Sequence, residues 1–108
     1  MTEHTLYDVP ATALKVMAQN LENASYPVRI RNNDVHASLA AGALWTFAKQ
    51  TGLDRDSESL VTVLTDFLGD LLHLCEQFSP DSSGEKLLRE SLKTALMHFE
   101  QENDERLF

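Results

Sequence analysis

The sequence holds few residues that could crosslink the chain or carry it through a membrane. It has one cysteine, Cys75, which excludes an intramolecular disulfide and lies among apolar residues, where a free thiol behaves as a small hydrophobe. No apolar run approaches the roughly 18 residues that span a bilayer, and the N-terminus, MTEHTLYDVP, lacks the basic and apolar regions of a signal peptide. These absences predict a soluble, cytoplasmic protein in a reducing compartment.

Catalytic motifs are also missing. No serine, cysteine or lysine lies in a nucleophile motif, and no glycine-rich loop that could hold a phosphate occurs in the sequence. We therefore expect no catalytic residue and no cofactor, and we predict a function in binding.

Basic residues are scarce in the second half of the chain. The net charge is −8, and residues 1–53 contribute nothing to it because four acidic residues balance four basic ones. Residues 54–108 hold thirteen acidic residues and only five basic ones. Such a surface repels nucleic acid and anionic lipid and attracts basic protein surfaces. We predict a protein partner with a basic surface, and neither a nucleic acid nor a membrane.

The spacing of apolar residues predicts an all-α, four-helix bundle-like fold. A chain of 108 residues is large enough for one core and too short for two, so we predict a single helical domain over residues 1–108. Apolar residues recur every three or four positions, and the predicted helices are about 9–24, 35–51, 57–78 and 84–103. Residues 26–31 alternate apolar and polar and are expected to be extended, as a short strand or a plain crossover.

The first two predicted helices have recognisable ends. Asp8 is expected to cap the first helix, and Asp34 the second. Gly52 is expected to end the second helix in the left-handed conformation that glycine adopts without steric cost. The inward face of the first helix is predicted to consist of Val9, Ala13, Val16, Met17 and Leu21.

The second predicted helix is apolar around most of its circumference. Its polar line consists only of Ser38, Gly42 and Lys49. A helix of this kind must be covered on nearly every side, so it is either the central helix of the bundle or it contacts a second subunit. For the second case we predict a homodimer through residues 26–31, or through the row formed by Ala37, Ala41, Trp45 and Ala48.

The third predicted helix has a polar row opposite a wide apolar arc. We predict that the row points away from the core, and it consists of Asp66, Asp70, His73 and Gln77. The arc is expected to face the core and consists of Leu60, Val63, Leu64, Phe67, Leu68, Leu71, Leu74, Cys75 and Phe78. A capping box of Ser82 and Glu85 is expected to start the fourth helix. Its predicted inward residues are Leu88, Leu92, Ala95, Leu96 and Phe99.

The polar row is the best candidate for chemistry in the sequence. Residues three or four apart lie on one helix face, so Asp66, Asp70 and His73 could hold a metal ion. Alternatively, the row is a solvated surface or a docking face for a protein. Gly69 beside the row favours docking, because a glycine inside an exposed helix costs about 1 kcal/mol. Close approach of a partner's backbone would explain the glycine.

We predict from these features a small, acidic, non-enzymatic interaction protein. It would be an adaptor, antitoxin or inhibitor of the phage or mobile-element type, whose third and fourth helices dock on a basic surface of a protein partner. The predicted partner-binding residues are Asp66, Asp70, His73, Glu76, Glu100, Glu102 and Asp104. One alternative is a metal-dependent helical-bundle enzyme that uses Asp66, Asp70 and His73.

A second alternative comes from residues 27–72, which resemble ribbon-helix-helix repressors. The order is an alternating segment, PVRIR, then a helix from Asp34, a turn at Thr51 and Gly52, and a second helix. The resemblance implies a dimer whose strands pair across the subunits, with Arg29 and Arg31 reading the major groove of DNA. The chain departs from that family in having a helix before the segment. A further departure is the acidic group at the second helix start, which consists of Asp54, Asp56 and Glu58.

Overall fold

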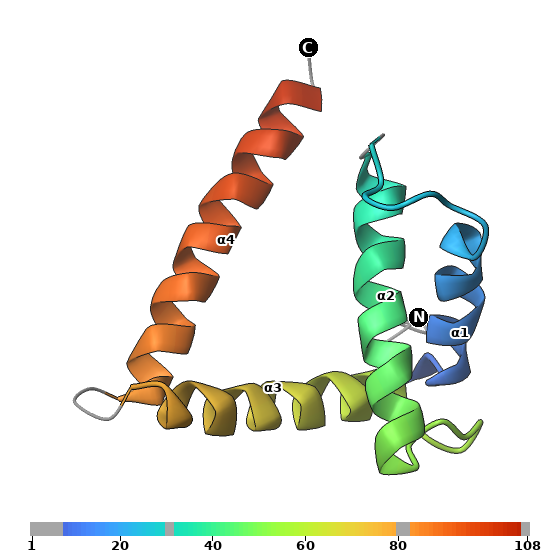
Figure 1. Ribbon diagram of the computed structural model, residues 1–108, viewed down its shortest axis with the longest axis horizontal. Helices are drawn as coiled ribbons and strands as arrows, with labels where there is room; N and C mark the ends of the chain where they lie inside the picture. Colours follow the sequence, from blue (N-terminus) through green and yellow to red (C-terminus); the bar gives the residue numbers. More distant parts are fainter. Residues whose placement is uncertain (1–7, 30–31, 80–82, 107–108) are drawn as a thin grey trace, which may run out of the picture. The chain divides into compact units, whose positions relative to one another are not determined.

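The protein is all-α, as predicted. The computed structural model describes residues 8–29, 32–79 and 83–106, with the side chains of the last range described up to residue 102. In these ranges the helices are α1 (Thr12–Ala18), the 3₁₀ helix η2 (Gln19–Leu21), α2 (Asn33–Thr51), α3 (Leu60–Gln77) and α4 (Gly84–Arg106) (Figure 1). The described residues contain no strand and only one isolated antiparallel bridge, between Pro10 and Ser59.

The chain divides into two compact units. Unit 1 comprises residues 1–67 and holds α1, η2, α2 and the start of α3. Unit 2 comprises residues 68–108 and holds the rest of α3 together with α4. Each unit is described below by itself, and the single domain expected from the chain length stays a prediction.

Helix α1 is shorter than predicted because its N-terminal neighbours pair with the segment before α3. The Ala11 N–H donates to the Glu58 carbonyl at 2.8 Å, and the Leu60 N–H donates to the Val9 carbonyl at 2.8 Å. These bonds hold the backbone around Pro10 in a bridge, so α1 begins only at Thr12. They also delay α3 to Leu60, where the sequence predicted a start at residue 57.

The inward face of α1 differs from the predicted one. Its N-cap is Ala11, without a side-chain hydrogen bond, so Asp8 is not the cap. Leu14 is the buried residue, at 3% exposure, whereas Val16 is 64% exposed. The two positions lie about 200° apart on a helix, so burial of Leu14 turns Val16 to solvent. The prediction that Val16 faces the core was wrong.

Helix α2 begins two residues earlier than predicted and ends where predicted. The Asn32 side chain accepts a hydrogen bond from the Val35 N–H at 2.9 Å, so Asn32 is the cap and Asp34 lies in the first turn. There the Asp34 carboxylate still interacts favourably with the positive end of the helix dipole. At the other end, Gly52 has φ 77°, which confirms the predicted left-handed end.

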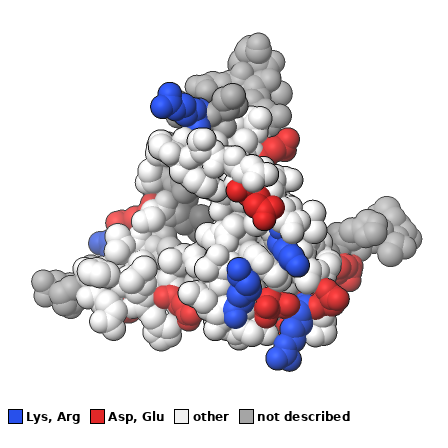
Figure 2. All heavy atoms as spheres, turned by 45° about the vertical axis from the view of Figure 1, so that its right-hand side comes forward, with Lys and Arg blue, Asp and Glu red and all other residues white. Residues whose placement is uncertain are grey.

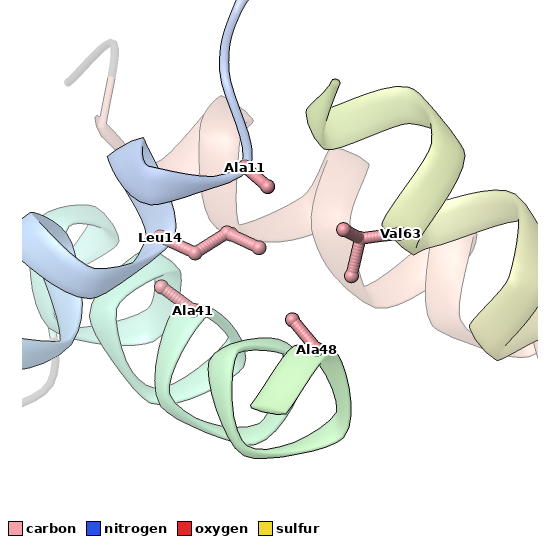
Figure 3. Packing of buried hydrophobic residues seen from close by; sticks show 5 residues of the cluster. All are labelled: Ala11, Leu14, Ala41, Ala48 and Val63. Atoms are coloured by element: carbon pink, nitrogen blue, oxygen red, sulfur yellow. The ribbon is translucent and has the colours of Figure 1, made fainter. Parts of the chain in front are cut away.

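The core of unit 1 is small and is formed by three helices. Figure 3 shows the five buried apolar side chains pointing toward one another from α1, α2, α3 and the residue before α1. They are Ala11, Leu14, Ala41, Ala48 and Val63. Phe47 of α2 also meets Phe67 of α3 edge to face, with ring centroids 5.2 Å apart. The alanines of α2 allow the close helix approach that their small side chains favour.

Ser38 belongs to the inside of unit 1 and not to a solvated polar line. Its side chain is buried, and its hydroxyl oxygen accepts a hydrogen bond from the Asn20 amide at 3.4 Å. The polar line predicted for α2 therefore includes one buried residue, which bonds to Asn20 of η2. A hydroxyl can occupy this position because its hydrogen-bonding capacity is met inside the chain.

Residues 26–29 form no strand. The Tyr26–Pro27 peptide bond is cis, and the Tyr26 hydroxyl donates to the Leu21 carbonyl at 3.2 Å. Of the segment predicted to be extended, Ile30 and Arg31 lie outside the described residues. The described part is a bent crossover between η2 and α2 (Figure 1).

Unit 2 is built around a close contact between the end of α3 and the start of α4. The Gly84 N–H donates to the Glu76 carboxylate. A Cβ atom on Gly84 would lie only 2.6 Å from the Glu76 backbone nitrogen, so the contact requires glycine. Of the predicted capping box, Ser82 lies outside the described residues, and the Glu85 carboxylate pairs with Arg89 at 2.6 Å. Glu76 therefore supplies one acceptor at this helix start, and the Ser83 hydroxyl oxygen supplies another by accepting from the Lys86 N–H at 3.4 Å.

The apolar face of α4 is exposed, which corrects the prediction that it faces the core. Leu88 is half-buried, but every residue from 89 to 102 is exposed. The exposed set includes four residues that were predicted to point inward: Leu92, Ala95, Leu96 and Phe99. The second half of α3 is similar, since its exposed apolar residues are Leu68, Leu72 and Leu74, and Phe78 directly after the helix is exposed as well. An apolar stripe predicts that something covers a helix, and unit 2 itself supplies no such cover.

Candidate protein-interaction surface

The polar row of α3 lies at the surface, as predicted. Asp66, Asp70, His73 and Gln77 are all exposed, whereas Val63, three residues before Asp66, is fully buried. Val63 lies at the edge of the apolar arc nearest to the row, so the boundary between the buried and exposed sides of α3 runs between them.

Two large apolar side chains border this row, and the sequence interpretation missed both as surface residues. Leu74 is 51% exposed and Phe78 is 78% exposed. Leu74 follows Asp70 by four residues, and Phe78 follows Leu74 by four, so each lies on a neighbouring face one turn further along. Leu74 lies at the edge of the predicted apolar arc, and Phe78 directly follows the last helical residue. These edge positions were the available sign that both could be exposed.

Gly69 has no steric reason to be glycine within the chain. A Cβ atom at this position would meet no atom within 4 Å outside the local helix backbone. The residue is helical and does not have a positive φ. Alanine would therefore fit and would stabilise the helix by about 1 kcal/mol. Gly42 of α2 has the same open surroundings and offers a matched control.

We define the α3 docking face as the polar row Asp66, Asp70, His73 and Gln77 together with Gly69, Leu74 and Phe78. Glu76, which was predicted to belong to the contact row, has a structural partner in the N-terminus of α4. Its carboxylate satisfies a helix-end N–H and interacts favourably with the helix dipole. Any contact it makes with a partner would compete with this bond.

The acidic residues of α4 are only partly described. Glu100 and Glu102 are exposed, and the side chain of Asp104 lies outside the described part of the chain. Their role in electrostatic steering remains a prediction. Charges of both signs mix on the face seen in Figure 2, which brings forward the side of Figure 1 that carries α1 and α2. This agrees with the balanced charge of residues 1–53.

The predicted self-association row on α2 needs correction. Ala41 is 2% exposed and Ala48 is 0% exposed, because both belong to the core of unit 1. Trp45 packs against this core, and only Ala37 is exposed. This side of α2 is covered by its own chain, so the row does not form a surface for a second subunit.

The two alternative functions find little support in the geometry. Among the described residues, no three His, Cys, Asp or Glu side chains are grouped so that they could hold a metal ion, and this includes Asp66, Asp70 and His73. For the ribbon-helix-helix alternative, Arg29 is exposed but residues 27–29 form no strand, and Arg31 lies outside the description.

Comparisons of the chain with protein families, curated proteins and solved structures gave no match. In the part of the chain that the structure describes, no helix combines the length and hydropathy needed to cross a membrane.

Proposed function

We propose that the protein is a small, non-enzymatic interaction protein that binds a basic surface of a protein partner through the α3 docking face. An adaptor, antitoxin or inhibitor of the phage or mobile-element type would act in this way. The proposal is carried by one observation, the exposure of Leu74 one turn after Asp70 and of Phe78 one turn after Leu74. An apolar centre with a polar rim is the usual composition of a protein interface.

The residue types at this face fit tight binding to a basic partner. An exposed aromatic side chain such as Phe78 can contribute strongly when it enters a partner's pocket. Asp66 and Asp70 would pair with lysine or arginine at the rim, and Glu100, Glu102 and Asp104 would add to the attraction at longer range. Gly69 would permit the partner's backbone to approach α3 closely.

Charge reversal tests the acidic part of the docking face. The partner is first captured by affinity purification from cells that produce the protein, then purified for binding measurements. We expect the double variant Asp66→Lys with Asp70→Lys to weaken binding at least tenfold, with a loss that shrinks as salt rises. Asp54→Lys with Asp56→Lys, at exposed acids outside the face, is the matched control. Equal binding by both double variants would remove the proposed contact row.

Alanine substitutions at Gly69 and Gly42 test whether a partner's backbone approaches α3 closely. Gly69→Ala and Gly42→Ala should each raise the free energy of unfolding by about 0.5–1 kcal/mol, because alanine is the better helix former and fits at both sites. Only Gly69→Ala should weaken partner binding. Denaturant unfolding and partner titration measure the two effects separately. If Gly69→Ala binds the partner as tightly as Gly42→Ala does, no backbone approaches α3 at this position.

A further inference from the structure

We draw no further inference here: the strongest candidate, the apolar stripe of α4 formed by Leu88, Leu92, Ala95, Leu96 and Phe99, carries no proposal because nothing in the structure shows what covers it.

Discussion

Unit 1 covers its apolar residues with helices that it supplies itself, whereas unit 2 has only the second half of α3 to set against α4. In unit 1, Leu14 and Val63 come from different helices and meet over the alanines of α2. In unit 2, Leu92 and Phe99 belong to an equally regular apolar pattern and remain exposed. The difference teaches that helical periodicity marks a face to be covered without saying which element covers it.

The largest expected effect is the difference in unfolding free energy between two leucine substitutions, one in each unit. Leu14→Ala should lower the free energy of unfolding by about 3 kcal/mol, because it leaves a cavity in the core of unit 1. Leu92→Ala should change it by less than about 0.5 kcal/mol in dilute, monomeric protein. Urea denaturation followed by circular dichroism measures both, with Val16→Ala as the exposed control within α1. Similar losses for the two leucines would break the distinction between the units.

The next effect concerns the close contact between the end of α3 and the start of α4 in unit 2. Gly84→Ala should destabilise the α3–α4 junction by about 2 kcal/mol, since its Cβ would overlap the backbone of Glu76 and Cys75. Amide hydrogen exchange should quicken in the first turns of α4 and stay unchanged in α1 and α2. Gly69→Ala, a glycine substitution with open space, is the control and should stabilise. If both variants stabilise, the start of α4 does not pack closely on the end of α3.

The smallest expected effect tests which residue of unit 1 caps the start of α2. Asn32→Ala should cost about 1 kcal/mol, because the Val35 N–H loses its acceptor. Asp34→Ala should cost only about 0.3–0.5 kcal/mol, through its interaction with the helix dipole. Thermal unfolding ranks the two variants. The reverse order would restore Asp34 as the cap, as the sequence suggested.

Several features could be predicted from the sequence because they depend on neighbouring residues. The all-α fold and the left-handed end of α2 at Gly52 follow from local spacing and from glycine's conformational freedom. The outward direction of Asp66, Asp70 and His73 follows from the amphipathic pattern of α3. For the candidate site, these residues could be named in advance, but their exposed neighbours Leu74 and Phe78 could not.

Other features depended on residues that are distant in the sequence. The bridge between Pro10 and Ser59 shortened α1 and delayed α3, and no local pattern in either segment encodes that pairing. The partner of Glu76 was likewise set by the approach of Gly84 across the α3–α4 turn.

By itself, the sequence determined that the chain is all-α, where the acidic charge lies and which helix faces are apolar, because these properties are local. Only the tertiary structure decided which apolar faces are covered. It placed Ala41 and Ala48 inside unit 1, where a subunit contact had been predicted, and left Leu92 and Phe99 of α4 exposed. The physical reason is that burial requires a second surface, and the pattern of one helix carries no information about where that surface comes from.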